Sequence, residues 1–427
     1  MPELSRDLLV SPRKKTMRST PLKQLILPMY LPSVIYAIGN GALTPVLVLA
    51  ALAVGFDDAT SSAVIGIGGF IGIMISPFLG GFIARVGDRR AMYIAMALSL
   101  IALNLFLLSL VSPPSQHIRA IFVVGIVLVA LASNTWLLAR QTYIAETTPI
   151  AWRSRALATL GGTFRFGELF GPLVATFMLA MWYLTSVVIF NIGAVLITLI
   201  MLFAFSLPRA QFDLDDIPDY AQPLHDAEAN KTTSVAATAI MGVAINALFI
   251  LRASRAVIIP LWGTYLGFDA TFITAIFGMS ALLDTTLFLV AGAVTDKWGR
   301  HWGLLPTLIV MSVGISVMIL WREPAGYIAG AALIGIGNGF GTGINMTVGA
   351  DLSPARNKAK FLGKWQAIAN IGNAGGPFII SGMTALAGLP WALASIAGIG
   401  FLGTIWAVTL MGRAYAMIGM DVKGNPL

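Results

Sequence analysis

The stretch G-A-V-T-D-K-W-G-R-H, residues 292–301, is a short charged loop between two long apolar segments. A degraded copy, G-G-F-I-A-R-V-G-D-R at residues 80–89, lies 212 positions earlier in an equivalent setting. Glycine tolerates the tight turn that such a loop needs, and charged side chains avoid an apolar surrounding. The pair therefore predicts two halves, each with a polar turn between apolar helices.

The composition is that of a membrane protein. Of 427 residues, 57% are hydrophobic and 11% are charged. A soluble chain of this size could not hide so much apolar surface, and the apolar runs of about 20 residues match the hydrocarbon core of a bilayer. There is no cysteine, and the three histidines show no metal-ligand spacing, so we expect neither disulfides nor a metal site. The sequence contains no nucleophile–base arrangement and no Walker loop, which argues against an enzyme.

Twelve apolar segments follow one another along the chain, and because bare backbone cannot face lipid, each should be a helix. They are residues 25–54, 61–84, 91–112, 118–140, 157–182, 185–206, 235–266, 270–294, 303–321, 325–348, 364–386 and 390–411. We expect an all-α polytopic membrane protein with one six-helix half at 24–206 and a second at 235–412. An acidic, proline-containing linker at 207–234 joins the halves, and polar tails at 1–23 and 413–427 flank them.

Lysine and arginine are concentrated in alternate connections. They gather in the N-terminal tail and after the second, fourth, eighth and tenth segments, whereas the opposite loops are poor in both. By the positive-inside rule, both termini and the loops at 80–89 and 292–301 are cytoplasmic, and we expect a plasma membrane location. The net charge of +8 is then a consequence of topology and does not indicate nucleic-acid binding.

The two halves repeat one another in sequence. The matches are Gly55-Phe56-Asp57 with Gly267-Phe268-Asp269, Ala145–Pro149 with Ala350–Pro354, and Gly167-x-x-x-Gly171-Pro172 with Gly372-x-x-x-Gly376-Pro377. Together with the loop at 292–301, this pattern resembles the major facilitator superfamily of transporters. The resemblance implies twelve transmembrane helices in two six-helix repeats, the major facilitator fold, with the solute site between the halves near the bilayer midplane.

The resemblance also implies a cytoplasmic gate that latches the halves in one state and releases them in the other. Its residues would be Gly292, Asp296, Lys297, Gly299 and Arg300 in the second half and Gly80, Arg85, Gly87 and Arg89 in the first. The first copy departs from the family pattern, with Ala84 where an aspartate belongs and Asp88 where an arginine is usual. We therefore expect an unequal pair of gates in which the second dominates. The alternative is that these charges only fix topology.

The paired glycine–proline segments predict close helix packing through Gly167, Gly171, Pro172, Gly372, Gly376 and Pro377. In the fifth segment the pattern resembles the antiporter motif of drug/proton exporters. Ala175 and Thr176 replace the closing glycine pair of that motif, so the match is partial. The motif favours efflux.

Five ionisable residues lie well inside the predicted helices: Arg165, Glu168, Arg252, Arg255 and Asp284. Each costs about 2.5–3.5 kcal/mol at a helix centre on insertion scales, so they should face a cavity or one another. Arg165 and Glu168 are three residues apart, which permits a local ion pair. Three arginines against two carboxylates leave one positive charge, which suits an anionic solute.

These charges support two functional hypotheses and one structural alternative. A desolvated carboxylate can carry a proton, and we expect Asp284, followed by Glu168, to couple proton movement to transport. Arg252, Arg255 and Arg165, with Arg140 at the inner end of the fourth segment, would pair with those carboxylates or bind an anionic substrate. The alternative is a set of structural ion pairs that lock helices together. Polar side chains that could line the same cavity are Asn40, Asn134, Asn338, Asn345, Gln366, Asn370 and Asn373.

The sequence thus predicts a secondary active transporter that works by alternating access of its two halves. We expect proton-coupled efflux of a drug-like or organic-anion compound, most like the twelve-span drug/proton antiporter group. The proton gradient would drive it without a cofactor, and its partners would be a small-molecule substrate and the lipid bilayer, with the chain acting as a monomer. One alternative is a proton symporter or uniporter that imports a nutrient or organic anion. Another is a non-transporting membrane sensor with the same fold.

Overall fold

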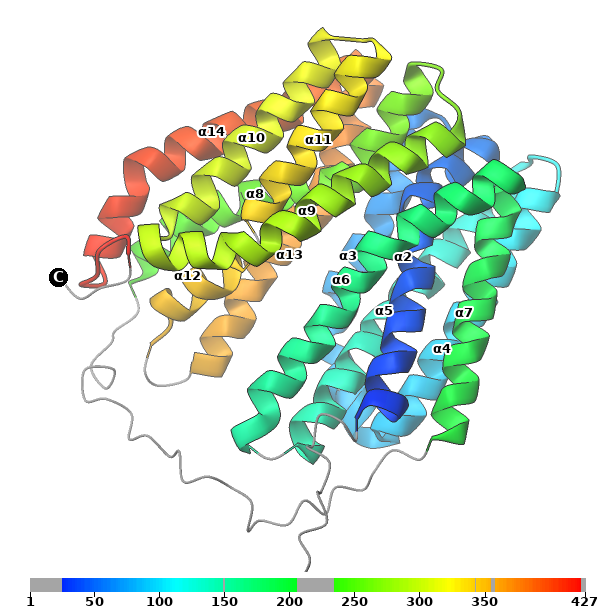
Figure 1. Ribbon diagram of the computed structural model, residues 1–427, viewed down its shortest axis with the longest axis horizontal. Coiled ribbons are helices and arrows are strands. Elements are labelled where there is room, and N and C mark those ends of the chain that lie inside the picture. The colour runs from blue at the N-terminus through cyan, green and yellow to red at the C-terminus, as the bar shows by residue number, and fades with distance from the viewer. Residues whose placement is uncertain (1–24, 149, 206–233, 342, 355–357, 424–427) are drawn as a thin grey trace, which may run out of the picture.

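The computed structural model describes residues 25–148, 150–205, 234–341, 343–354 and 358–423, and these residues are almost entirely helical (Figure 1). The first half contains η1 (Ile26–Tyr30, one π-helical turn), α2 (Leu31–Ala53), α3 (Asp58–Val86), α4 (Asp88–Val111), α5 (Gln116–Thr147), α6 (Ile150–Met181) and α7 (Leu184–Ala204). The second contains α8 (Val235–Tyr265), α9 (Ala270–Trp298), α10 (His301–Leu320), α11 (Pro324–Phe340), α12 (Ile344–Leu352), α13 (Lys358–Ala387) and α14 (Leu389–Ala416). With η1 joined to α2, and α11 and α12 together forming one span, the predicted two six-helix repeats are confirmed.

Eleven helical stretches of the described chain are long and apolar enough to cross a membrane. The remaining member of the repeat, α13, is 30 residues long, but Gln366, Asn370 and Asn373 make its middle polar. The predicted N-terminal tail at 1–23 lies outside the described residues, as does the linker at 207–234 apart from Ser234 at its border. Many large apolar side chains remain exposed on outer faces, such as Ile200, Phe203 and Leu402, as expected of a protein surrounded by lipid.

One predicted helix is interrupted. The tenth apolar segment, expected as a single run over 325–348, breaks between Phe340 and Ile344. Gly343 has a φ of 86°, which glycine adopts readily and other residues avoid. The break is only three residues long, Gly341-Thr342-Gly343, and apolar residues flank it on both sides, so hydropathy alone could not reveal it.

The repeated Gly-Phe-Asp sequence forms the same turn in both halves. Gly55 and Gly267 end their helices with φ values of 95° and 81°. Asp57 and Asp269 then cap the next helix, accepting hydrogen bonds from backbone N–H groups at 2.7 and 2.9 Å. A glycine after one helix and an aspartate before the next are what a tight helix–helix turn requires, so the sequence repeat has a structural cause.

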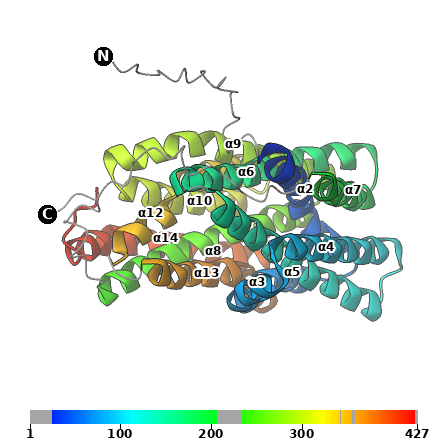
Figure 2. The same cartoon turned by 90° about the horizontal axis from the view of Figure 1, so that it is seen from below.

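The halves lie side by side, with α3 against α13 and α6 against α9 (Figure 2). We call the end that carries the turns at Gly87 and Gly299 the signature-loop end, and the end that carries Gly55 and Gly267 the opposite end. Near the opposite end Thr176 Oγ1 donates to Thr274 Oγ1 of the other half at 3.2 Å. A Cβ on Gly66 would lie 3.2 Å from Pro377.

Toward the signature-loop end, five described glycines have open space beside them. Gly80, Gly81, Gly161 and Gly162 on the first half and Gly363 on the second would meet nothing within 4 Å of an added Cβ. The described parts of the two halves therefore touch from the opposite end to the middle of the bundle. Nearer the signature-loop end, the five glycines just named do not contact the other half.

Candidate functional site

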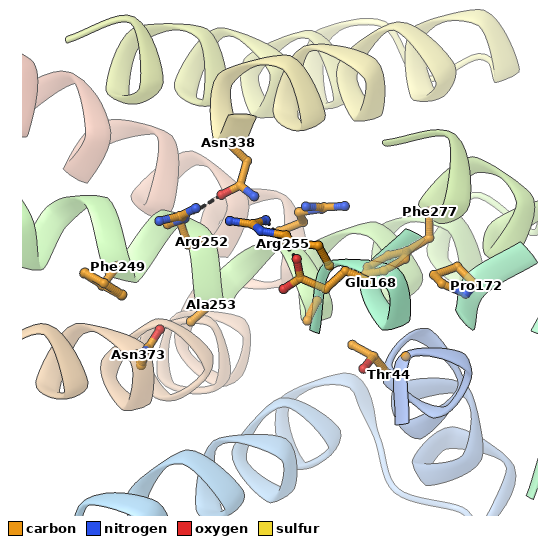
Figure 3. A pocket seen from close by; sticks show the side chains of 13 residues that line it. Thr44, Glu168, Pro172, Phe249, Arg252, Ala253, Arg255, Phe277, Asn338 and Asn373 are labelled. Atoms are coloured by element: carbon orange, nitrogen blue, oxygen red, sulfur yellow. Dashed lines mark hydrogen bonds and ion pairs between the residues drawn. The ribbon is translucent and has the colours of Figure 1, made fainter. Parts of the chain in front are cut away.

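A cavity of about 310 Å³ lies between the two halves, midway along the helices (Figure 3). Its lining residues are Gly41, Thr44, Arg165, Glu168, Pro172, Phe249, Arg252, Ala253, Arg255, Ala256, Phe277, Asn338 and Asn373. We call this space the charged cavity, because it brings together four of the five ionisable residues that the sequence places inside helices. The fifth, Asp284, lies directly behind the lining.

Asp284 on α9 is the centre of the charge network and is only 2% exposed. Its Oδ2 accepts hydrogen bonds from Arg255 Nη1 at 2.9 Å and from Asn338 Nδ2 at 2.6 Å. Its Oδ1 lies 3.9 Å from Nη1 of Arg165, which belongs to the other half. One carboxylate is therefore held by cations from both halves, and a motion that separates α6 from α9 would break the Arg165 contact.

Arg165 and Glu168 form the local ion pair that their spacing predicts. Arg165 Nη1 donates to Glu168 Oε2 at 2.9 Å, and its guanidinium carbon lies 5.0 Å from the ring centre of Phe288. The Glu168 side chain is 57% exposed, in contrast to Asp284. Arg165 thus faces two carboxylates of very different accessibility, one in its own half and one across the interface.

Arg252 and Arg255 lie on one face of α8, and their partners, Asn338 and Asp284, are hydrogen-bonded to each other. Arg252 Nε donates to Asn338 Oδ1 at 2.7 Å (Figure 3). The amide of Asn338 in turn donates to Asp284 at 2.6 Å. Arg255 lies over Phe277, with its guanidinium carbon 5.2 Å from the ring centre. Asn338 therefore links a guanidinium in the cavity wall to the buried carboxylate, so a ligand bound at Arg252 would be sensed at Asp284.

Asn338 owes its position to tight packing of α11. A Cβ on Gly339 would meet the backbone oxygen of Asp284 at 2.8 Å, and one on Gly337 would meet Met311 at 2.7 Å. Small residues allow helices to approach this closely inside a membrane. The glycines around Asn338 therefore bring its amide within hydrogen-bond distance of α8 and α9.

The charged cavity combines a cationic surplus with aromatic walls. The residues that form it contribute three guanidiniums and two carboxylates, counting Asp284 behind the lining. Phe249 and Phe277 supply apolar surface beside the arginines. Sequence reasoning missed both aromatic residues, and the only available signal was the position of Phe249 three residues before Arg252, on the same helix face.

The predicted cavity-lining amides divide into two groups. Four line a cavity in this structure: Asn134, Asn338, Asn370 and Asn373. The other three, Asn40, Asn345 and Gln366, line neither the charged cavity nor the adjoining cavity that contains Asn134 and Asn370. Asn345 Nδ2 donates to Gln366 Oε1 at 3.3 Å, and Gln366 Nε2 donates to Asn370 Oδ1 at 3.2 Å. Asn345, Gln366 and Asn370 thus form a hydrogen-bonded chain that ends at the cavity lined by Asn370.

Arg140 lies apart from the charged cavity. It is 1% exposed, and its guanidinium carbon lies 4.5 Å from the ring centre of Trp136 and 5.1 Å from that of Phe164. Its Nε donates to the backbone oxygen of Trp136 at 3.1 Å, while Nη1 and Nη2 have no hydrogen-bond partner among the described residues. The structure therefore places this arginine in the core of the first half.

The second signature loop is anchored within its own half. Arg300 Nε and Nη2 donate to Asp351 Oδ2 and Oδ1 at 2.8 and 3.2 Å, and Tyr415 donates to the same carboxylate at 3.0 Å. Arg300 Nη1 also donates to the backbone oxygen of Lys423 at 2.8 Å. Gly299 has a φ of 107°, as the turn requires. Lys297 is exposed, and the surroundings of Gly292 and of the Asp296 side chain lie outside the described part.

The first signature loop has no such anchor among the described residues. Gly87 makes the same turn, with a φ of 87°. Arg89 Nε donates to Tyr93 four residues later at 2.9 Å, and Gly80 and Arg85 are exposed. The two loops therefore share a backbone shape but differ in how their charges are held.

The glycine–proline segments pack helices against each other in both halves. A Cβ on Gly167 would meet the backbone of Ala37, and one on Gly171 the backbone of Gly41. In the second half, a Cβ on Gly372 would lie 2.7 Å from the backbone oxygen of Asn246, and one on Gly376 2.7 Å from that of Ile250. The α2–α6 and α8–α13 contacts are thus repeat-related close approaches, and Pro172 and Pro377 follow directly after them.

A charged cavity between two repeated six-helix halves is the arrangement of a solute transporter that works by alternating access. The model of the Major Facilitator Superfamily matches residues 29–253 and again 241–416. The chain therefore belongs to the Major Facilitator Superfamily, and it is a transporter and not an enzyme.

Individual relatives are distant. An MFS-type transporter, gkaD, of Penicillium citrinum is 28% identical over 110 residues, which are 26% of this chain and 19% of that relative. A D-xylose-proton symporter structure is 17% identical, covers 94% of this chain and 100% of that chain, and has a TM-score of 0.70. The human organic anion transporter MFSD10 (TETRAN) is 14% identical over 91% of this chain and 100% of that chain, with a TM-score of 0.61. At these identities the structural likeness shows the fold alone.

Proposed function

We propose that this chain is a proton-coupled transporter of organic anions in the plasma membrane. The signature-loop end is the cytoplasmic end, because lysine and arginine gather in the loops on that side. The charged cavity binds the anion, and Asp284 carries the proton. In this assignment the described conformation faces inward, since the contacts between the halves lie toward the opposite end.

The observation that carries the proposal is the contact of Asp284 with both halves. Its carboxylate faces Arg255 from α8 and Asn338 from α11, with Arg165 across the interface at 3.9 Å. Arg252 lies one hydrogen-bonded step away through Asn338. Protonation of Asp284 weakens the attraction between Arg165 and α9, so gain or loss of one proton alters how strongly the halves hold together.

Electrostatics predict the sign of the coupling. While Asp284 is ionised it competes with a bound anion for Arg255 and Arg165, and a proton on Asp284 removes that competitor. Anion binding and protonation then strengthen each other by the same factor, because coupling between two sites is reciprocal. Mutual strengthening is the property of a symporter, in which both ligands move together.

The energetics of anion uptake also favour movement of the anion together with a proton. A membrane potential that is negative inside opposes the entry of a monoanion by about 2.3 kcal/mol per 100 mV. A proton that moves with the anion cancels this charge, and each unit of pH difference then supplies about 1.4 kcal/mol, or roughly a tenfold accumulation.

Calorimetric titration of the purified chain with p-toluenesulfonate, in buffers of different ionisation enthalpy, tests the proposal. This anion belongs to a strong acid, so it does not cross a bilayer as the neutral acid. We expect each bound anion to bring up to one proton with it, and Asp284→Asn to abolish that uptake while binding persists. Glu168→Gln is the matched control and should keep the uptake, since Glu168 is 57% exposed. Absence of binding, or proton release on binding, would overturn the assignment.

Exchange of an anion for a proton is the second candidate, and the Gly167–Pro172 segment favours it through its likeness to the antiporter motif. Proteoliposomes loaded with p-toluenesulfonate distinguish the two modes, with protein-free vesicles as the control. External acid would accelerate exit under exchange, whereas it would drive uptake into empty vesicles under symport.

A further inference from the structure

A second cavity, of about 350 Å³, adjoins the charged cavity and has a different chemical character. Residues of α3, α5, α8 and α13 line it, and it shares Ala253 and Asn373 with the charged cavity. None of its lining residues is charged or aromatic, and three of them are asparagines: Asn134, Asn370 and Asn373. We call this space the amide cavity. The two spaces are neighbours along one path, with all of the charge on one side.

The amide cavity exists because α3 presents glycines to it. Gly68, Gly69 and Gly72 are all lining residues and carry no side chain, so on this face of α3 only Ile65 and Ile73 present side chains to the space. A Cβ on Gly69 would already lie 3.4 Å from the backbone of Ala374 on α13, and one on Gly72 would lie 3.1 Å from the amide of Asn134. The spacing of the two helices is therefore close, and the volume depends on these positions being glycine.

The asparagines offer hydrogen bonds that the described protein does not fully use. Asn134 Nδ2 donates to the backbone oxygen of Ala130 at 2.8 Å, and Asn370 Oδ1 accepts from Gln366 at 3.2 Å. Each of these amides uses one end in this way. Asn373 has no hydrogen-bond partner within the described residues, and it lies at the junction of the two cavities, next to Ala253 and away from Asn338 (Figure 3). An apolar group placed here would remove water from these amides without replacing its hydrogen bonds.

We propose that the two cavities form one substrate site with two chemically distinct parts. The substrate is an organic anion that carries a neutral hydrogen-bonding group, such as an amide or a hydroxyl, a few bonds from its charge. The anionic group binds at Arg252 and Arg255, and the neutral group binds among Asn134, Asn370 and Asn373. The anionic part of this assignment rests on the proposed function, and the amide cavity adds the neutral part.

The proposal predicts selectivity between anions of equal size and charge. Hexanoate and N-acetylglycine have the same number of non-hydrogen atoms and the same carboxylate, but only N-acetylglycine has an amide. Each hydrogen bond made in the amide cavity should change the dissociation constant by up to about tenfold. We therefore expect the full-length chain in detergent to bind N-acetylglycine about tenfold more tightly than hexanoate in calorimetric titration.

Variants then assign the selectivity to the amide cavity. Asn373→Leu and Asn134→Leu, made separately, keep the approximate side-chain volume and remove the amide, and each should bring the ratio of the two dissociation constants toward one. Arg252→Gln should weaken both ligands together and leave the ratio near its wild-type value. Gly193→Ala is the matched control, because a Cβ at this position on α7 would meet nothing within 4 Å, and it should change neither constant.

The outcomes separate the two proposals. If neither acid binds, or if Arg252→Gln changes nothing, the anion assignment fails and this inference fails with it. If both acids bind, Arg252→Gln weakens both, and wild type shows no preference for N-acetylglycine, the amide cavity has no recognition role while the proposed function stands. If the preference exists but survives both asparagine variants, it arises elsewhere and the inference is wrong.

Discussion

The ion pair between Arg300 and Asp351 permits a quantitative test of how the second signature loop is held. Two hydrogen bonds join the charged side chains, at 2.8 and 3.2 Å, and Tyr415 adds a third to the carboxylate at 3.0 Å. The side chains are 15% and 11% exposed, so solvent screens the pair only in part. Removing one partner of a buried pair costs about 3–5 kcal/mol, and at this partial exposure we expect about 2–4 kcal/mol for Arg300→Gln and for Asp351→Asn.

A double-mutant cycle isolates the interaction itself. Because each single variant leaves the other charge without its partner, the double variant should lose about 1.5–3 kcal/mol less than the sum of the singles. The free energy of unfolding in detergent, measured for all four proteins, gives this coupling. Arg89→Gln in the first loop is the control and should cost less than about 0.5 kcal/mol, since Arg89 is exposed and bonds only locally to Tyr93. Single effects that add to within about 0.5 kcal/mol would refute the claim that this pair anchors the loop.

Three further perturbations test the helix packing, the buried arginine and a helix cap. Gly171→Leu should destabilise the chain by about 3 kcal/mol or more, because its Cβ would clash with the backbone of Gly41. Gly193→Leu is the control and should be nearly neutral. Equal effects of the two variants on unfolding in detergent would contradict this packing role. Arg140→Met should leave the free energy of unfolding unchanged or raise it by about 1–2 kcal/mol. The reason is that methionine replaces a buried cation that has no carboxylate partner among the described residues. A clear loss of stability would show that the charge is compensated. Asp57→Ala should cost about 0.5–2 kcal/mol at neutral pH. The hydrogen bond from the backbone N–H of Thr60 holds the pKa of Asp57 below its usual range. The cap is therefore fully stabilising above about pH 4 and is lost as pH falls through the lowered pKa. A difference in unfolding free energy between variant and wild type that persists in strong acid would exclude this cap.

The repeat and the helices could be predicted from the sequence because both depend on local features. Apolar runs of membrane length must be helical, and the Gly-Phe-Asp turns carry their own capping residues. The Arg165–Glu168 pair is local in the same sense, since a spacing of three places both side chains on one helix face. Each of these features depends only on residues that are close together in the sequence.

The partners of Asp284 could not be predicted in this way. Arg255 lies 29 positions before it, and Asn338 lies 54 positions after it on a different helix. Periodicity indicates which side of a helix faces inward, but the rotation and depth of three separate helices decide which side chains meet. Hydropathy likewise placed the end of the fourth segment at Arg140, whereas α5 continues to Thr147, so the arginine lies inside the helix against Trp136.

The two halves share a fold but not a charge pattern. At two levels of the bundle, the ion-paired side chains lie mainly in the second half. At the signature-loop end, Arg300 and Asp351 pair in the second half. The repeat-related positions in the first half are Asp88 and Glu146, two like charges; burial first, and then the charge of Glu146, raise the pKa of Asp88. At mid-bundle, the second half supplies Asp284 and the groups that bind it most closely, and the first half supplies Arg165 across the interface.

A titration of Asp284 would therefore act first on α8, α9 and α11, whose side chains it bonds directly. Its effect would reach the first half through the single 3.9 Å contact with Arg165. Because the second half also holds its own loop closed through Arg300, it can respond as one body. Under the proposed function, the first half would be the surface against which that body moves, and Arg165 would make its position depend on the charge of Asp284.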